Sequence, residues 1–175
     1  MGIKVYTPDL SRLSESTAKA VEDALVYNFS YVGERCVAEA RTGHGYTDRT
    51  GNLTSSMGYV VVNDGQVVME SSFESQHGQY ENMQHVQFVS KSGKNVDYWA
   101  KGASGDGKEG SASGRQFARS LASQQPEGIA LIVVAGMNYA RYVADKGFNV
   151  LDSAEILADR LVPSIMEQLG FRRTA

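Results

Sequence analysis

The sequence lacks most of the features that mark secreted and membrane proteins. Its 175 residues include one cysteine, Cys36, so no disulfide bond can form within the chain. No apolar run approaches the roughly 20 residues that a membrane-spanning helix needs, and the first ten residues lack the apolar core of a secretory signal. We therefore expect a protein that is made in a reducing cytoplasm and has no membrane partner.

An excess of charge of one sign is also lacking. The 17 basic and 20 acidic residues give a formal net charge of −3. This balance gives no reason to expect nonspecific binding to nucleic acid or to a membrane surface, although it leaves room for a locally basic face. The length suits one domain with a substantial core, since a chain of about 150 residues buries roughly two-thirds of its unfolded surface.

Motifs for catalysis and cofactor binding are absent or incomplete. The three histidines show no metal-ligand spacing, and no Gly-x-Ser-x-Gly turn marks a hydrolase. Gly102, Gly107 and Lys108 match the spacing of a phosphate-binding loop, but Glu109 stands where the magnesium-binding Ser or Thr belongs. We therefore expect no enzyme activity, no catalytic residues, no cofactor and no bound metal. This stretch is interpreted as a flexible glycine-rich loop.

Two amphipathic helices are predicted near the ends of the chain. Residues 8–42 carry one apolar stripe in steps of three and four, with Cys36 as a small buried member of that stripe. A second stripe runs over residues 153–169, where Pro163 should kink or split the helix. A short helix or turn is expected at 138–145.

Three strands are predicted between the two long helices. Residues 57–63 and 66–73 are rich in β-branched side chains, and Asp64-Gly65 between them is typical of a two-residue hairpin turn. Residues 129–136 are apolar throughout, which indicates a strand covered on both faces. The predicted fold class is therefore α+β, with a long N-terminal helix and a C-terminal helix packed on a small antiparallel sheet.

A long polar stretch, residues 74–116, separates the second and third strands. It is rich in Gly, Ser, Lys, Asn and Gln, and residues 101–114 are close to a flexible linker in composition. A marginal pair of strands within 86–99 and a short helix over 114–124 are compatible with the pattern. We predict a single domain, 1–175, that carries this stretch as a flexible insertion loop.

Two short segments about ninety residues apart carry most of the functional signal. YTDRTGNLTSSM at 46–57 leads into the first run of valines, and GMNYARYVADKG at 136–147 follows the last strand. Together they resemble the signature of the tail-completion, or head–tail joining, proteins of long-tailed bacteriophages. The residues that carry the resemblance are Thr50, Gly51, Leu53 and Ser56 in the first segment and Tyr139, Ala140, Tyr142, Val143, Asp145 and Gly147 in the second.

The resemblance implies a structural virion component that works by assembling. Proteins of this family look like α+β subunits of a ring, usually of six, between the head connector and the tail, with DNA passing through the lumen. Other copies of the chain, the connector and the tail proteins are the expected partners, in the host cytoplasm and then in the virion. The candidate contacts are Arg49, Arg141 and Asp145 beside the motifs, and Tyr98 and Trp99 in the polar stretch.

Two other interpretations stay open at this level. One is another neck or tail component, such as a tail terminator or head-closure subunit of similar architecture. The other is an unrelated soluble binding module or enzyme. The aromatic residues that flank the strand ends fit either a seal between sheet and helices or a contact between subunits; they are Tyr46, Tyr59, Tyr139, Tyr142 and Phe148.

Overall fold

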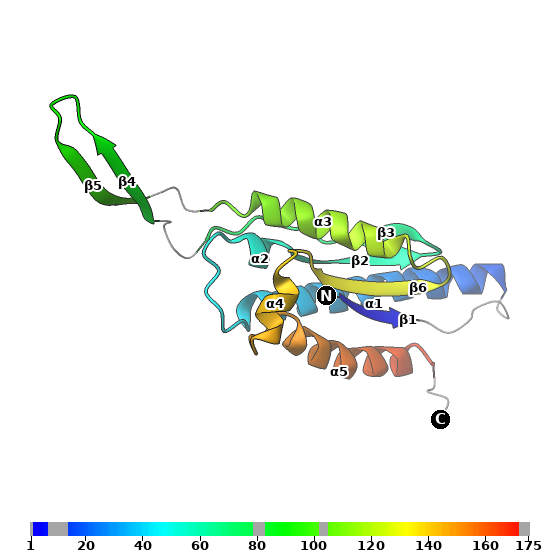
Figure 1. The fold of residues 1–175 in the computed structure, drawn as a ribbon. Coiled ribbons are helices and arrows are strands. Elements are labelled where there is room, and N and C mark those ends of the chain that lie inside the picture. The colour runs from blue at the N-terminus through cyan, green and yellow to red at the C-terminus, as the bar shows by residue number, and fades with distance from the viewer. Residues whose placement is uncertain (1, 7–13, 79–82, 102–104, 172–175) are drawn as a thin grey trace.

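The protein combines antiparallel strands with helices packed on the main sheet, which confirms the predicted α+β class (Figure 1). The computed structural model describes residues 2–6, 14–78, 83–101 and 105–171. Its elements are β1 (Gly2–Tyr6), α1 (Glu15–Thr42), α2 (Asn52–Ser55), β2 (Met57–Asn63), β3 (Gln66–Glu70), β4 (Met83–Val89), β5 (Asn95–Lys101), α3 (Lys108–Ala122), β6 (Ile129–Ala135), α4 (Ala140–Asp145) and α5 (Asp152–Gln168).

The main sheet is built around β6, the apolar strand. Its strand order is β1-β6-β2-β3, and every neighbouring pair is antiparallel. Helices α1 and α5 lie on one face and α3 lies on the other (Figure 1). Leu131 and Val133 therefore face α1 and α5, whereas Ile132 and Val134 face α3. This arrangement confirms the prediction of cover on both faces, and the second cover is a helix of the same chain.

The predicted turn between β2 and β3 is present. Asp64 has φ 46° and Gly65 has φ 78°, as a two-residue turn between right-twisted strands requires. The Asp64 side chain accepts a hydrogen bond of 2.8 Å from the N–H of Gly128, and this bond ties the turn to the approach to β6. The turn residues therefore both reverse the chain between β2 and β3 and hold the start of β6 beside β2.

The N-terminal region differs from the prediction in two ways. Helix α1 begins at Glu15 rather than at residue 8, since Ser14 is extended with φ −63° and ψ 149°. The predicted start lies within residues 7–13, outside the described part of the chain. The strand β1, which no pattern indicated, pairs along its whole length with β6. It is a five-residue segment with a partner more than 120 residues away, so only tertiary pairing defines it.

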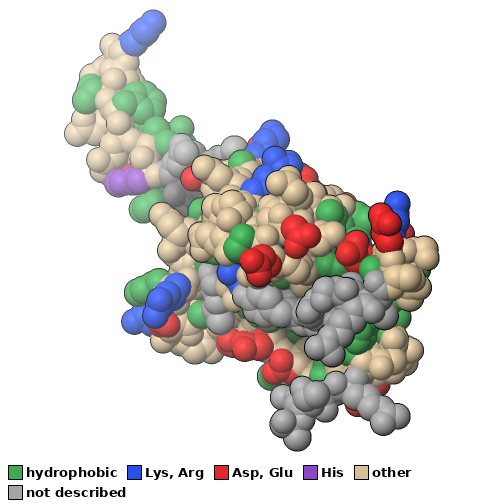
Figure 2. Space-filling view, turned by 90° about the vertical axis from the view of Figure 1, so that its right-hand side faces the viewer, with side chains coloured by type: hydrophobic (Ala, Val, Ile, Leu, Met, Phe, Trp, Pro, Cys, Tyr) green, Lys and Arg blue, Asp and Glu red, His purple; other side chains and the backbone are tan. Residues whose placement is uncertain are grey.

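The interpretation of 74–116 as one flexible loop is wrong over most of its length. Strands β4 and β5 form a regular hairpin within this stretch, and α3 begins at Lys108, inside the segment interpreted as a linker. The marginal strand pair within 86–99 is therefore confirmed and longer than expected. The hairpin stands away from the rest of the protein (Figures 1 and 2).

The glycines of α3 explain why a linker-like composition folds as a helix. Gly110, Gly114, Ala118 and Ala122 are all buried and follow one another at intervals of four, so they form one stripe of small residues. A Cβ on Gly110 would lie 1.9 Å from the carbonyl oxygen of Asn52. Glycine is therefore needed for close contact between backbones, at the expense of helix propensity.

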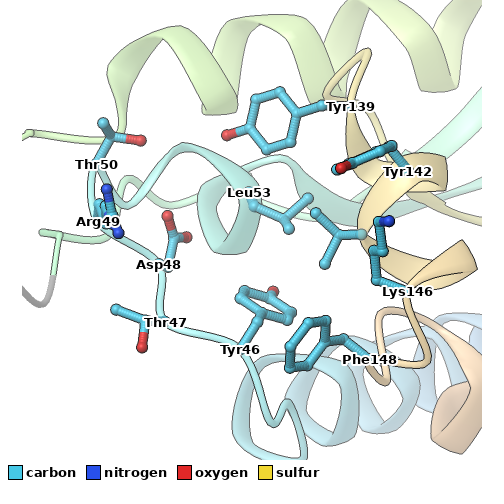
Figure 3. A pocket seen from close by; sticks show the side chains of 11 residues that line it. Tyr46, Thr47, Asp48, Arg49, Thr50, Leu53, Tyr139, Tyr142, Lys146 and Phe148 are labelled. Carbon is cyan, nitrogen blue, oxygen red and sulfur yellow. The ribbon is translucent and has the colours of Figure 1, made fainter.

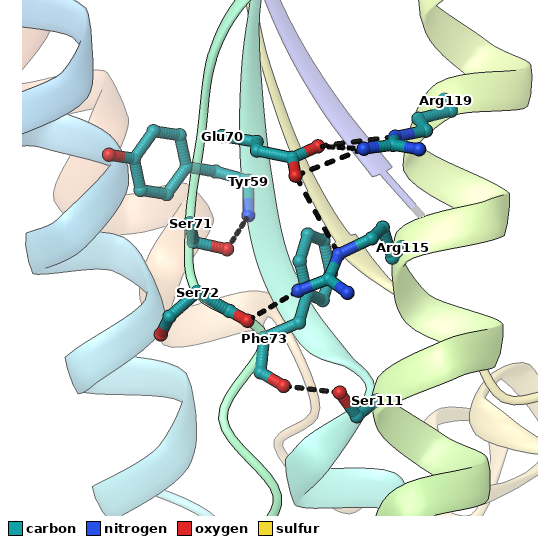
Figure 4. A network of polar contacts seen from close by, with 8 residues as sticks. All are labelled: Tyr59, Glu70, Ser71, Ser72, Phe73, Ser111, Arg115 and Arg119. Carbon is teal, nitrogen blue, oxygen red and sulfur yellow. Dashed lines mark hydrogen bonds and ion pairs between the residues drawn. The ribbon is translucent and has the colours of Figure 1, made fainter.

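Polar contacts fasten β3 and the chain after it to α3 (Figure 4). Arg119 makes a bidentate contact with Glu70 at 3.1 and 3.2 Å, and Arg115 donates a bond of 2.7 Å to the carbonyl of Ser72. The predicted strand 66–73 is too long by three residues, because the chain turns at Phe73, where φ is 49°. The Phe73 ring fills the space beside Gly58.

Helix α5 continues through Pro163 without being split. Its first turn is held by Asn149, whose side-chain oxygen accepts a bond of 3.1 Å from the N–H of Ser153. The predicted short helix at 138–145 corresponds to α4. Among the described residues, no helix combines the length and the apolar character needed to span a membrane.

Candidate functional site

The two motif segments, far apart in sequence, meet and form one surface groove (Figure 3). The groove has a volume of about 460 Å³. We call it the motif groove; it is lined by Tyr46, Thr47, Asp48, Arg49, Thr50 and Leu53 from the first segment and by Tyr139, Tyr142, Val143, Lys146 and Phe148 from the second segment and the residue after it. Eight residues singled out in the sequence therefore line a single site; they are Tyr46, Arg49, Thr50, Leu53, Tyr139, Tyr142, Val143 and Phe148.

The first segment turns sharply before β2, and Gly51 makes this turn possible. Gly51 has φ 74°, a left-handed conformation that side chains with a Cβ rarely adopt, and α2 begins at the next residue. The buried Asp48 carboxylate accepts a bond of 2.7 Å from the N–H of Thr54 and so satisfies a free donor in the first turn of α2. Arg49 lies between these two anchors and is exposed. The prediction of a constrained turn at Gly51 is confirmed.

Ser56 joins the two segments directly. Its hydroxyl donates to the carbonyl of Leu53 at 2.7 Å and accepts a bond of 3.3 Å from the N–H of Met137. Its own carbonyl accepts from the N–H of Gly136 at 3.1 Å. Ser56 is fully buried, so these bonds are shielded from water. The Ser of the first motif therefore fixes the start of the second.

The second segment presents α4 along the other side of the groove. Ala140 is buried against the core, whereas Tyr142 is 65 % exposed, with the Lys146 ammonium 5.2 Å from its ring centroid. Arg141 and Asp145 form an exposed ion pair of 3.9 Å along the helix. After the helix the chain reverses at Gly147, where φ is 85°. Arg141 and Asp145 lie beside the groove and do not line it.

Four of the eleven residues that line the groove are aromatic, and two of the tyrosines have raised pKa values. Burial raises the pKa of Tyr46 to about 12, and burial followed by the charge of Asp48 raises the pKa of Tyr139. The buried hydroxyl of Tyr46 lies beside Thr54, yet no described group stands in hydrogen-bond geometry to it. Such a site is suited to bind an apolar or aromatic group.

Two predicted contact residues lie elsewhere. Tyr98 and Trp99 belong to β5 and are 49 % and 61 % exposed, and neither lines the motif groove. Trp99 stacks on His85 with 4.7 Å between ring centroids, and the His85 Nε2 lies 2.6 Å from the Asp97 carboxylate. The hairpin is therefore a second surface, separate from the groove.

Residues outside the motif positions hold the backbone of the first segment in place. Ser55 donates to the carbonyl of Gly51 at 2.6 Å and accepts from the N–H of Gln76 at 2.7 Å. Gly78 and Gly105 pack so closely that a Cβ on either would lie within 2.2 Å of the backbone oxygen of Arg49 or Thr50. The one sequence signal for this close packing was the group of glycines between 78 and 114. Of these, Gly110 and Gly114 could have been recognised, because they are spaced as on one face of a helix.

The glycine loop that matched a phosphate-binding spacing packs against the first motif. Gly107 has φ 67° and lies against Ser55 and Gln76, while Lys108 pairs with Asp106 at 2.7 Å.

Cys36 is buried, its thiol donates to the carbonyl of Ala154 at 3.4 Å, and burial raises its pKa to about 11. Within the described residues, no three His, Cys, Asp or Glu side chains are grouped as metal ligands.

Comparisons with known proteins add no relatives. No family model matches the chain, and neither the curated proteins nor the solved structures searched contain a significant match.

Proposed function

We propose that this chain is a structural subunit of a ring that joins the head connector and the tail of a phage or prophage. The observation that carries the proposal is the convergence of the two motif segments on one groove. Residues about ninety positions apart have no local reason to meet, yet Thr50 and Leu53 line the same depression as Tyr139 and Tyr142. The motif groove is the surface that we assign to assembly.

The composition of the groove favours protein binding. Tyr and Arg contribute disproportionately to interface energies, and Tyr139, Tyr142, Phe148 and Arg49 are all exposed at this site. Tyr46 and Tyr139 are neutral, with raised pKa values. Covering these rings by a partner would remove apolar area from water without leaving a phenolate charge unpaired.

The expected partners are other copies of the chain, a connector and tail proteins, with DNA only passing through the lumen. The alternative is another neck or tail position, such as that of a tail terminator or head-closure subunit. Both belong to the same class of function, because each is a ring subunit of a virion.

Microscopy and mass measurement test the proposal together. Purified protein, alone and with particles from the strain that encodes it, should form closed rings by negative-stain microscopy, and particle proteomics should detect the chain. Tyr142→Ala should weaken ring formation by about tenfold or more in subunit concentration, because it removes an exposed aromatic anchor, whereas Tyr27→Ala should leave it unchanged. Tyr27 is a suitable control because it is 76 % exposed on α1 and lies outside the groove. Absence of the chain from every particle would refute the virion role.

A further inference from the structure

The β4–β5 hairpin has two chemically different faces. Because side chains alternate along a strand, the register places Val86 opposite Tyr98 and Phe88 opposite Val96 on one face. The other face carries the stacked His85 and Trp99 and the bonds from His85 and Gln87 to Asp97. This second face thus combines a polar network with the exposed side chains of Trp99 and Val89. The first face is a strip of four apolar side chains, which we call the apolar strip.

The apolar strip is uncovered in the single chain. Phe88 is 52 % exposed and Tyr98 is 49 % exposed, and in the described structure the two strands pack mainly against each other. Figure 2 shows apolar side chains gathered on the hairpin, which stands clear of the body. An isolated two-stranded hairpin is only marginally stable in water. A hairpin with an exposed apolar face is therefore stabilised when a partner covers that face.

Charge indicates what kind of partner this is. Residues 83–101 contain three lysines and one aspartate and carry +2, within a chain whose formal net charge is −3, so the remainder carries −5. The turn holds Lys91 and Lys94, and within the described structure neither side chain has an acidic partner. The hairpin and the rest of another copy of this chain therefore carry opposite net charges, which favours their approach. The groove itself is lined by the cations Arg49 and Lys146, so apolar contact rather than local charge pairing would hold the strip in it.

The same chain offers a second uncovered apolar surface, the motif groove. Its rim is formed by Tyr139, Tyr142 and Phe148, all exposed, and its volume of about 460 Å³ can accept large side chains. The hairpin and the groove are different surfaces, so contact between them is heterologous. Heterologous contacts repeat from copy to copy and generate either a closed ring or a filament, whereas a self-matching surface stops at a dimer.

We propose that the apolar strip of one copy, with Phe88 and Tyr98 as its anchors, docks into the motif groove of the next copy. This inference deepens the proposed function and rests on its self-association, for which it names the two mating surfaces. The strip spans two residue steps, about 7 Å, within strands of seven residues that are about 23 Å long, so the lysine turn extends beyond the strip.

Cysteine cross-linking tests the contact cleanly, because Cys36 is buried and its raised pKa makes it unreactive. Val96→Cys on the strip and Thr47→Cys in the groove leave the aromatic anchors in place. The two variants are purified separately, mixed at a concentration where light scattering detects oligomers, and oxidised mildly. The mixture should give a disulfide-linked dimer, and each variant alone should give none. The double variant should give a ladder whose longest member reports the ring size. Tyr27→Cys mixed with Val96→Cys is the matched control and should stay uncross-linked.

Each other outcome overturns the inference in a recognisable way. Cross-links within one single variant would mean a self-matching contact. Oligomers without cross-links in the mixture would move the contact elsewhere and leave the ring proposal standing, whereas a protein that stays monomeric and absent from particles would remove both. The rival partner is nucleic acid. Binding of duplex DNA that quenches the single tryptophan, Trp99, and is lost in Lys91→Ala/Lys94→Ala would assign the hairpin to nucleic acid instead.

Discussion

Gly51 and Gln76 are in such close contact that a Cβ on Gly51 would lie 2.0 Å from the Gln76 carbonyl oxygen. The same glycine has φ 74°. Two independent constraints, backbone conformation and space, therefore require glycine at the centre of the first motif. The segment that leads to the hairpin passes directly behind the turn that shapes the groove.

Replacing Gly51 by alanine should therefore lower the unfolding free energy by much more than the strain of a left-handed backbone alone. Gly128 is the matched control, because it has φ 76° and a Cβ added to it would meet nothing within 4 Å. Gly128→Ala should cost about 1–2 kcal/mol of unfolding free energy, and Gly51→Ala about 3 kcal/mol or more, since the clash with backbone adds to the strain. Urea unfolding measures both. Equal losses in the two variants would mean that the Gln76 contact relaxes freely.

Gly114→Ala should destabilise the protein, although alanine normally improves a helix by about 1 kcal/mol. The expected sign is reversed because a Cβ at this position would lie 2.4 Å from the carbonyl oxygen of Ser56. Ala112, exposed on the same helix, is the control, and Ala112→Gly should show the ordinary loss of about 1 kcal/mol. Thermal unfolding of both variants checks this, and a stabilised Gly114→Ala would show that α3 is not held by close packing.

Sequence patterns predicted the parts of the fold that local chemistry determines. β2 matches its predicted bounds of 57–63, and the Asp64-Gly65 turn is present, because alternation and left-handed turn residues act over a few positions. β1 was missed because its five residues acquire their structure only by pairing with β6. Nonlocal pairing of this kind leaves little trace in the strand itself.

The glycine-rich stretch shows how composition can mislead. Glycine indicates flexibility when it stands alone, yet Gly110 and Gly114 recur at helical spacing and give α3 a face flat enough to touch the backbone of the first motif. The family resemblance singled out both motif segments, but nothing in the residues themselves stated that the two would line one groove. Tyr98 and Trp99 were expected at a contact and lie on the hairpin, where the docking proposal applies to Tyr98.

Ser56→Ala should lower the unfolding free energy by about 1–3 kcal/mol, because it leaves the partly buried N–H of Met137 without its acceptor, the fully buried Ser56 hydroxyl. Ser120 offers a matched control, since its hydroxyl also bonds a carbonyl three residues earlier, at 2.7 Å, but is exposed. Ser120→Ala should change stability by less than about 0.5 kcal/mol. Hydrogen exchange gives the specific signature, because Met137 should lose protection in Ser56→Ala and not in Ser120→Ala.

Acid should loosen the hairpin before the body unfolds. Bonds from Gln87 and then His85 hold the pKa of Asp97 below its ordinary value of about 3.9. Because the pKa is lower in the folded state, the unfolded state binds the proton more readily. The stability that Asp97 gives to the folded hairpin is therefore present above about pH 4 and is lost as the pH falls through the folded pKa. Trp99, the single tryptophan, stacks on His85 and reports the change by its fluorescence.

The fluorescence should shift below about pH 4 while far-UV circular dichroism stays constant, and Asp97→Asn should abolish this step. Asp106 is the matched control. It also has a lowered pKa, through its bonds with Lys108, but lies outside the hairpin, so Asp106→Asn should leave the step in place. A fluorescence step that survives in Asp97→Asn would assign the acid response to another group.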